Sequence, residues 1–243
     1  MRIRRKKWAR PELAQCSYYI SDAPSMKNKW NSAFENVNVP IYAEFGCGKG
    51  SFAAECAYRY PDINWLAFDI KSEMLAVARR NIEGFFESKN AEHNNLLLVS
   101  HNISLINKAI GSSDKIGRIY INFCNPWERG KHHKRRLTHP RQLIQYREFL
   151  TDGGEIRFKT DDDGLFEDSL EYFQECGFTL VKKTYDLHSE YPEDNIMTEH
   201  EKMFTEEGKK IKFLAAVKDR SLPEETVKKY IKGEETGEQD SGI

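Results

Sequence analysis

The chain has 243 residues, 39% of them hydrophobic, and a formal net charge of −1, which suits a globular protein of one or two domains and excludes a polycation. No window approaches 18 apolar residues and the basic N-terminus lacks an apolar core segment, so we expect a cytoplasmic protein without a membrane span or secretory signal. The five cysteines lack CxxC spacing, which argues against a disulfide framework and a zinc site.

Strand-like and helix-like patterns alternate from Pro40 to about Val217, which is typical of βαβ units and a mostly parallel sheet. We expect strands at 41–45, 65–70, 96–99, 119–123, 155–159, 178–185 and 211–217. We expect helices at 51–60, from a Ser72 cap onward, at 142–150, at 165–176 with Gly177 at its end, and near 198–204. This pattern divides the chain into a basic N-terminal extension (1–39), one α/β domain (40–217) and an acidic, flexible C-terminal tail (218–243).

A glycine-rich loop, Gly46, Gly48 and Gly50, stands where the first long strand meets its helix. Asp69 ends the next strand, 23 residues after Gly46, close to the spacing at which an acidic residue accepts from ribose hydroxyls. NAD and S-adenosylmethionine both carry that ribose. The GxGxG spacing and the acidic Glu44 before the loop favour S-adenosylmethionine, because a carboxylate repels a pyrophosphate and attracts a sulfonium or amino group. A Rossmann-type dehydrogenase, or a plain turn with an exposed Asp69, remains the alternative.

The segment 118–136, RIYINFCNPWERGKHHKRR, combines a buried strand, an Asn125-Pro126 break and a dense run of cations. A polar strand end beside a cationic loop suits a polyanion bound next to a planar base. The alternative is a turn followed by a solvated charge run. Trp127 either stacks on an exposed base or packs under the strand end.

With these motifs in view, the chain resembles the bacterial tRNA (guanine-N7)-methyltransferases. The matching segments are EFGCGKG, NFCNPWERGKHHKRR, FKTDDDGLFEDSL and NIMTEHEKMF, and the likeness runs from the N-terminus to about residue 217. The resemblance implies an α/β, Rossmann-like class I methyltransferase fold with a mostly parallel seven-stranded sheet and helices on both faces. It also implies S-adenosylmethionine as cofactor, tRNA as partner and methylation of a variable-loop guanine, without membrane or metal. Nothing in the sequence separates a monomer from a homodimer.

The resemblance also implies roles for individual residues. Cofactor contacts fall on Glu44, Gly46, Gly48, Gly50, Asp69, Asn102 and Asn125. Catalytic roles fall on Asn125, Asp161 and Glu201, and substrate contacts on Arg129, Asp161, Thr198, Glu199, His200 and Glu201. RNA contacts fall on Lys131, His132, His133, Lys134, Arg135 and Arg136.

The chain departs from the family pattern at several of these positions. Asn102 and Asn125 each replace an aspartate, Asp69 shortens a glutamate, Arg129 replaces a lysine and His200 replaces a tyrosine. An asparagine keeps a carbonyl acceptor of similar shape but loses the negative charge. The alternative function is therefore a catalytically weakened tRNA-binding protein that keeps the methyltransferase fold.

Overall fold

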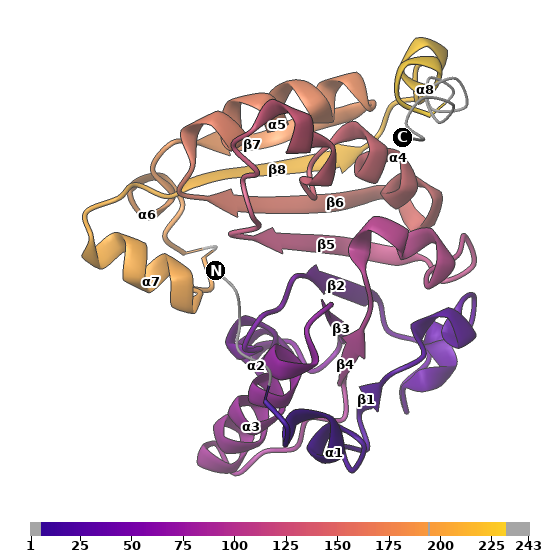
Figure 1. Ribbon diagram of the computed structural model, residues 1–243, viewed down its shortest axis with the longest axis vertical. Helices are drawn as coiled ribbons and strands as arrows, with labels where there is room; N and C mark the ends of the chain where they lie inside the picture. The colour runs from indigo at the N-terminus through magenta and orange to yellow at the C-terminus, as the bar shows by residue number, and fades with distance from the viewer. Residues whose placement is uncertain (1–5, 194, 232–243) are drawn as a thin grey trace, which may run out of the picture.

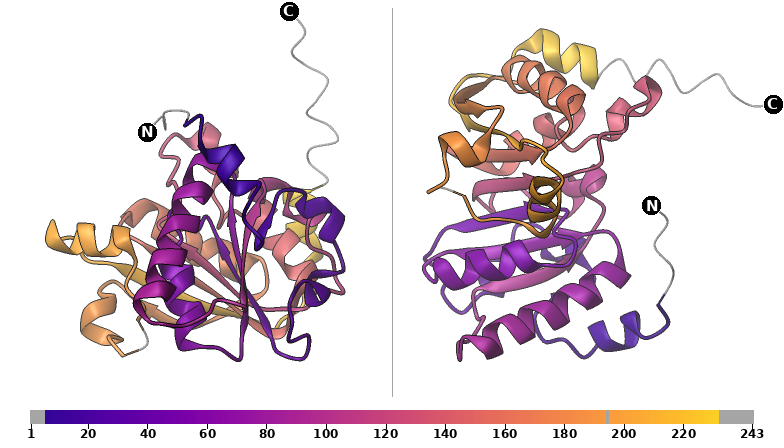
Figure 2. Two further views of the ribbon diagram at one scale, coloured as in Figure 1. Left: turned by 90° about the horizontal axis from the view of Figure 1, so that it is seen from below. Right: turned by 90° about the vertical axis from the view of Figure 1, so that its left-hand side faces the viewer.

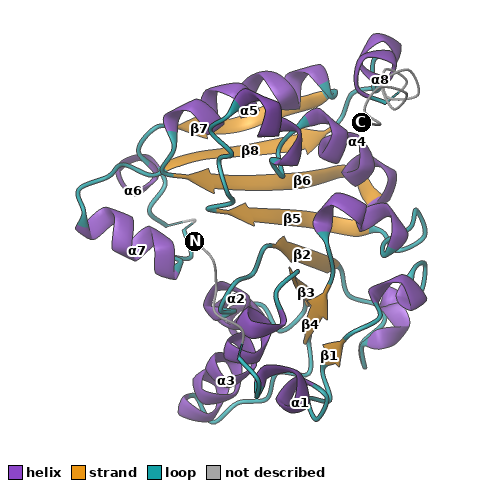
Figure 3. Cartoon of the chain, viewed as in Figure 1, coloured by secondary structure: helices purple, strands orange, loops and turns teal. Residues whose placement is uncertain are grey.

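The computed structural model describes residues 6–193 and 195–231, which fold around one eight-stranded sheet (Figures 1 and 3). The strands, in chain order, are β1 (Tyr19–Ile20), β2 (Ile41–Phe45), β3 (Asn64–Asp69), β4 (Leu96–Ser100), β5 (Ile116–Asn122), β6 (Leu150–Thr160), β7 (Phe178–Thr184) and β8 (Lys212–Lys218). Their spatial order is β1-β4-β3-β2-β5-β6-β8-β7, in which only β8 runs antiparallel to its neighbours β6 and β7. The expected mostly parallel α/β sheet is confirmed, with one strand more than expected.

Two helical layers cover the sheet (Figure 2). The helices are α1 (Ala9–Leu13), α2 (Ser51–Arg59), α3 (Ser72–Ser88), α4 (Pro140–Phe149), α5 (Asp163–Glu175), α6 (Leu187–Glu190), α7 (Glu199–Glu206) and α8 (Glu224–Tyr230). Short 3₁₀ segments are η1 (Ala23–Met26), η2 (Trp30–Ala33), η3 (Ile103–Lys108) and η4 (Gly130–Arg135). The Phe52 ring of α2 contacts Tyr120 on one face, and the Tyr146 ring of α4 contacts Phe45 on the other.

Local sequence explains most of these boundaries. In α3 the fully buried Leu75, Ala78 and Ile82 recur every three or four residues, as an amphipathic helix requires. The expected Ser72 cap is wrong, because Lys71 is the N-cap residue and Ser72 already lies within the helix. Gly177 ends the α5 segment at a φ of +70°, a backbone conformation that favours glycine.

The two ends of the chain hold more structure than the sequence patterns indicate. β1 pairs with β4, and the buried Trp30 donates its indole N–H to the Ala109 carbonyl at 2.8 Å, so the expected extension packs into the main core. Near the other end, α8 is anchored where the Tyr230 hydroxyl donates to Glu175 at 2.8 Å. This helix differs from the expected flexible tail, whose last part, 232–243, lies outside the described residues.

Candidate active site at the carboxyl edge of the sheet

The residues predicted for cofactor and substrate gather at one edge of the sheet. The parallel strands β2, β3, β4, β5 and β6 all end there, and each ends at or is followed by at least one predicted residue. Helix α7, which follows Thr198, lies beside the same edge (Figure 1). Ligands of open α/β sheets bind outside the carboxyl ends of the strands, so the topology itself assembles the candidate site.

Backbone N–H groups tie the glycine loop to β3. Gly46 and Cys47 both donate to the Phe68 carbonyl, at 2.9 and 2.8 Å, and Gly48 donates to Asp69 Oδ2 at 3.1 Å. Gly50 has a φ of +75°, and a Cβ there would lie 2.8 Å from Ala78 Cβ, so glycine lets α2 and α3 pack closely. The loop is therefore short, rigid and open above Gly46, where an added Cβ would meet nothing within 4 Å.

Asp69 is held with its carboxylate at the end of β3. Oδ1 accepts from the Lys71 N–H at 2.8 Å, and Oδ2 accepts from Gly48. Burial raises the pKa of this carboxyl, against the backbone N–H groups of Lys71 and Gly48, which lower it. A carboxylate offers about four acceptor positions, so two remain for hydroxyl groups of a ligand.

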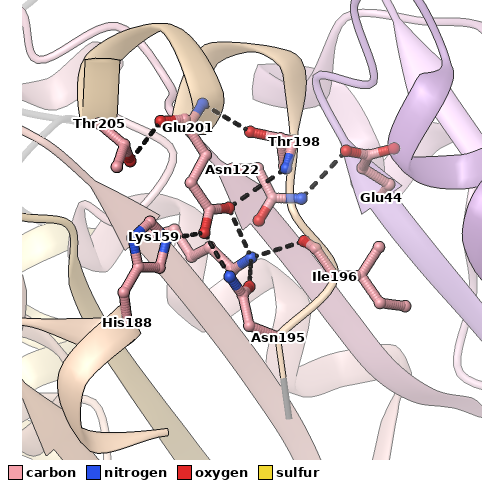
Figure 4. Close-up of polar contacts among 9 residues, drawn as sticks. All are labelled: Glu44, Asn122, Lys159, His188, Asn195, Ile196, Thr198, Glu201 and Thr205. Atoms are coloured by element: carbon pink, nitrogen blue, oxygen red, sulfur yellow. Dashed lines mark hydrogen bonds and ion pairs between the residues drawn. The ribbon is translucent and has the colours of Figure 1, made fainter. Parts of the chain in front are cut away.

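Glu44 is an acidic side chain buried on the sheet face at the same edge (Figure 4). Its Oε1 accepts from Asn122 Nδ2 at 3.1 Å, while Glu44 Oε2 and Asn122 Oδ1 are buried acceptors without a partner among the described residues. Burial raises the pKa of Glu44 to about 7, although the Asn122 bond and the Lys159 charge oppose that rise. Two unpaired buried acceptors fit a ligand that brings a positive charge or N–H donors.

Asn102 lies after β4 and caps η3. Its Oδ1 accepts from the Ser104 N–H at 3.0 Å, so part of its acceptor capacity serves the local turn. The second lone pair and the side-chain amide are available to a ligand. Together these acidic and amide groups fit a ligand with ribose hydroxyls and a cationic group, the donor set that S-adenosylmethionine presents.

Asn125 stands in a strained turn after β5. Its Oδ1 accepts from the Trp127 N–H at 2.9 Å, and both Phe123 and Trp127 have positive φ angles, 51° and 45°. Residues held in this region without being glycine cost free energy and cluster at functional sites. The turn forms one wall of an open hollow of about 300 Å³, lined by Asn125, Pro126, Trp127, Glu128, Arg129 and His132.

The basic segment η4 exposes most of its cations, whereas Arg136, directly after it, is buried. Lys131, Lys134 and Arg135 are exposed, and the Arg135 guanidinium lies 5.1 Å from the Trp127 ring centroid. His132 and His133 are half-buried. Arg136, expected to contact RNA, is only 3% exposed, donates to the Pro126 carbonyl at 2.6 Å and pairs with Asp168 on α5. Its long-range partner turns Arg136 inward, where it holds the loop against the helix.

Asp161 follows β6 and reaches the edge partly exposed. Its Oδ2 pairs with Lys209 Nζ at 3.3 Å, and its backbone carbonyl accepts from Lys212 Nζ at 2.8 Å. The neighbouring Asp162 caps α5 by accepting from the Leu165 N–H at 2.6 Å. Asp161 therefore keeps acceptor positions for a ligand, whereas Asp162 serves the helix.

Glu201, expected to contact the purine, is fully buried and all its acceptor positions are occupied (Figure 4). Oε2 accepts from Lys159 Nζ at 3.0 Å and from the Thr198 N–H at 3.2 Å. Oε1 accepts from Asn195 and faces His188 Nε2 at 2.6 Å. Burial alone would raise the pKa of Glu201, but the Lys159 charge and these hydrogen bonds hold it below its usual value. Direct contact between this carboxylate and a substrate is incompatible with that arrangement.

Two other residues of the same motif, Glu199 and His200, reach the surface of the edge, whereas Thr198 is only 8% exposed. Thr198 is the N-cap of α7 and forms a capping box with Glu201, whose N–H donates to Thr198 Oγ1 at 3.0 Å. His200 is exposed and stacks against Phe123, with ring centroids 6.3 Å apart. Glu199 is exposed and pairs with Lys49 of the glycine loop at 2.9 Å. The cofactor loop and α7 are thus in direct contact across the edge.

Sequence reasoning missed Lys159, Asn122, His188 and Asn195. Lys159 and Asn122 are in register on β6 and β5, and both point to the face that carries Glu44. Polar residues at inward positions of buried strands were the available signal. Their partners were not readable, because Glu201 lies 42 residues after Lys159.

Within 6–193 and 195–231, no cluster of His, Cys, Asp or Glu has the arrangement of a metal site. Among the same residues, no helix is long and apolar enough to cross a membrane.

The chain is similar to known methyltransferases. Residues 38–214 match a family described as putative methyltransferase. A tRNA (guanine-N(7)-)-methyltransferase of Clostridium perfringens (strain SM101 / Type A) is 55% identical over 218 residues, which cover 90% of this chain and 100% of that protein. A protein of the same name from Clostridium botulinum (strain Eklund 17B / Type B) is 57% identical over 219 residues, with the same coverage.

Solved structures support the fold. The 16S rRNA methyltransferase KamB has a TM-score of 0.54 at 12% identity, covering 73% of this chain and 87% of that one. A methyltransferase from Pyrococcus furiosus has a TM-score of 0.51 at 18% identity, covering 74% and 76%. At such low identity these likenesses bear on the fold alone, and they confirm the expected methyltransferase fold.

Proposed function

The chain belongs to the family of bacterial tRNA (guanine-N7)-methyltransferases, and on this premise we propose that it methylates N7 of a guanine in the tRNA variable loop. The observation that carries the proposal is the shared edge of the sheet. There the acidic groups suited to a cationic cofactor lie beside a strained turn and an exposed basic loop. No observation favours a tRNA-binding protein without catalysis.

S-adenosylmethionine is the cofactor and supplies a methyl group activated by attachment to a sulfonium. Asp69 would accept from the ribose hydroxyls, since two of its acceptor positions are free of backbone partners. Asn102 would accept from the adenine amino group through its second lone pair. Glu44 and Asn122 would hold the cationic end, because each presents an unpaired buried acceptor. The backbone at Gly46 and Gly48 leaves room for this ligand.

Guanine N7 carries a lone pair at neutral pH, so no residue has to remove a proton before methylation. The chain's task is to align the base and to stabilise the positive charge that develops on the purine. We assign the electrostatic part to Asp161, whose partly exposed carboxylate is the acidic group of the KTD motif at this edge. Asn125 would orient the base through its amide, and the Thr198 hydroxyl would donate to an acceptor on the base edge.

Glu201 receives a different role from the one that the sequence implies. Its four partners make it the anchor of Thr198, so it acts on the substrate through that residue. Glu199 and His200 lie at the surface of α7, where His200 offers a flat ring in place of the family's tyrosine. Arg129 lines the hollow beside Asn125 and suits a phosphate or base contact.

We assign tRNA phosphates to the exposed cations Lys131, Lys134 and Arg135, with His132 and His133 beside them. Such contacts supply affinity and salt dependence without selecting a base. Arg136 is left out of this set, because its guanidinium is occupied by Pro126 and Asp168.

The proposed function is tested by incubating the protein with methyl-labelled S-adenosylmethionine and tRNA that lacks 7-methylguanosine. We expect label in 7-methylguanosine on digestion, and none when the variable-loop guanine is replaced by adenosine. Asp69→Ala serves as the cofactor control and should bind S-adenosylmethionine at least tenfold more weakly in calorimetry. Label at another position, or equal cofactor affinity in the two proteins, would contradict the assignment.

A further inference from the structure

A buried cation, Lys159, lies beneath residues 195–198, which we call the strap because they carry the chain across the edge into α7 (Figure 4). Its ammonium donates to Asn195 Oδ1, to the Ile196 carbonyl at 2.9 Å and to Glu201 Oε2 at 3.0 Å. The three acceptors use all three N–H donors of the lysine. None of these acceptors belongs to β6, the strand that carries Lys159. All three hydrogen bonds of the ammonium therefore go to the strap and the first turn of α7.

Lys159 and the first turn of α7 supply most of the strap's backbone hydrogen bonds. The Ile196 carbonyl accepts from Lys159 and the Thr198 N–H donates to Glu201, while the Asn195 N–H donates to the Pro192 carbonyl at 3.3 Å and the Thr198 carbonyl accepts from the Lys202 N–H at 3.0 Å. The Ile196 side chain is also buried in the main apolar core. Met197 between them is 51% exposed. Glu201 is the only residue of α7 that is buried, and an eight-residue helix is marginal without tertiary anchors. The position of α7 is therefore set by its polar cap together with Phe204, which packs partly buried against the apolar cluster around Leu187 and Phe213.

The same lysine is next to the cofactor side of the site. Lys159 is in register with Asn122 on β5, and Asn122 donates to Glu44. A continuous polar row thus runs across the sheet from the buried acid near the glycine loop to the cap of α7. Removing one partner of a buried ion pair leaves an uncompensated charge, so the fold tolerates the presence of both charges or the absence of both better than the loss of one.

We propose that Lys159 is a positioning residue, which holds Thr198 at the substrate through the Ile196 carbonyl, Asn195 and Glu201. The inference rests on the proposed function, because Thr198 is assigned there to the guanine. Loss of Lys159 releases the strap, lowers turnover on tRNA and leaves the cofactor acceptors Asp69 and Asn102 in place.

Two variants separate positioning from stability. Lys159→Met removes the ammonium and leaves the buried Glu201 without its lysine partner, so this variant is expected to lose thermal stability. Lys159→Met/Glu201→Gln removes both charges and should regain most of that stability, but it still lacks the bonds to Ile196 and Asn195. We expect at least a tenfold loss of kcat in the double variant, whereas S-adenosylmethionine affinity should change much less, because only the Lys159 charge near Glu44 is lost on the cofactor side.

Lys218→Met is the matched control. Lys218 also binds a backbone carbonyl and a carboxylate, at Leu150 and Asp152, but it does so at the far end of β8. This variant should lose stability without losing kcat. Hydrogen exchange of the amides at 195–206 should be at least tenfold faster in the double variant and unchanged in the control.

Each outcome either supports or overturns the role of Lys159. A double variant that regains kcat to within twofold of wild type, or whose 195–206 amides exchange at the wild-type rate, would overturn the proposal. Faster exchange in a protein whose wild type does not methylate tRNA would support the anchoring by Lys159 and refute the proposed function. If turnover is also slow in Lys218→Met, loss of stability alone explains the loss of activity. That result would also overturn the proposal.

Discussion

At the scale of single residues, burial decides what the acidic groups of the site can do. Asp69, Glu44 and Glu201 all lie at the same edge, yet their surroundings differ. Glu201 has four hydrogen-bond partners and its pKa lies below the usual value, whereas Glu44 has one and its pKa is raised to about 7. A buried carboxyl with a single partner has an acceptor left for a cationic ligand, whose charge would favour its ionised form. A carboxyl with four partners has none left and holds the structure together.

The Glu44 environment predicts how stability depends on pH. Below pH 4.5 the carboxyl is protonated in both the folded and the unfolded state. Between pH 4.5 and about 7 the unfolded chain ionises it while the folded protein retains the proton, so this group's contribution falls as pH rises through that window. The total loss amounts to about 3 kcal/mol. Urea unfolding of wild type and Glu44→Gln from about pH 4 to 8, without cofactor, should show a downward slope that the variant lacks. Parallel pH profiles would mean that Glu44 titrates normally.

We propose that Asn125 is the residue at which the absence of a negative charge bears most directly on turnover. Its Oδ1 accepts from the Trp127 N–H, and an aspartate keeps that acceptor while adding negative charge at the position that we assign to the purine. We therefore expect Asn125→Asp to preserve the turn and raise the single-turnover rate, by no more than about 10²–10³-fold. Asn125→Ala, which loses the turn bond, should be slower than wild type. An Asn125→Asp rate at or below wild type would show that the neutral amide is required for orientation.

At the scale of elements, the sequence predicts helices and strands whose signals lie within one segment. It does not predict contacts between residues that are far apart in the chain. The strand 41–45 is confirmed at both ends as β2, because apolar alternation and the following glycines are local signals. β1 has only two residues and no pattern to detect, and α8 is helical because Glu175 anchors it from 55 residues away. Arg136 and Glu201 are expected from their motifs to contact RNA and substrate, but the structure buries both in ion pairs with Asp168 and Lys159, which lie 32 and 42 residues from them. Motifs locate the site, and only the packed structure tells which charges are used to hold it together.

The basic loop η4 gives a prediction that separates these two uses of charge. Lys134 and Arg135 are exposed, so Lys134→Gln/Arg135→Gln should weaken tRNA binding. The slope of log K against log salt should also become flatter, by on the order of one unit for each phosphate that the variant no longer neutralises. Arg136→Gln removes the buried cation of an ion pair with the partly exposed Asp168 and its bond to the Pro126 carbonyl, so it should lower the melting temperature instead, with cofactor affinity unchanged.

Filter binding at several salt concentrations and thermal unfolding measure the two effects. Lys228→Gln on α8 is the matched control for an exposed cation away from the site. If the exposed pair leaves the salt slope unchanged, the loop is a solvated face and tRNA binds elsewhere.

At the scale of the whole molecule, the site joins segments from both ends of the fold. The glycine loop belongs to the first half of the chain and α7 to the last quarter, and they meet through the Lys49–Glu199 pair at 2.9 Å. Lys49 is further tied to α3, because its backbone carbonyl accepts from Asn81 at 2.9 Å. The ion pair therefore joins the segment that we assign to the cofactor to the segment that we assign to the base.

We predict that the Lys49–Glu199 pair has a small effect on cofactor binding, and that swapping the two charges between these positions preserves that effect. Both side chains are about half exposed, at 45% and 51%, and exposed pairs of this kind contribute about 0.2–1 kcal/mol. Lys49→Glu and Glu199→Lys each place like charges together, so each should weaken S-adenosylmethionine binding by about two- to fivefold. The double exchange restores opposite charges and should return the dissociation constant close to that of wild type. Calorimetry measures the dissociation constant of each of the four proteins at low and high salt. The differences in dissociation constant among them should vanish near 1 M salt, where screening acts over about 3 Å.

The exposed Glu55–Arg59 pair on α2 supplies the control for this cycle. Its atoms lie 2.5 Å apart, on one face of a single helix, and neither residue reaches α7. Exchanging those two charges changes helix stability slightly and should leave cofactor affinity as it is. If reversing Lys49 alone weakens the cofactor and the double exchange does not restore it, Lys49 acts on the cofactor directly. The contact with α7 would then be a consequence of proximity, and the two halves of the site would bind their ligands independently.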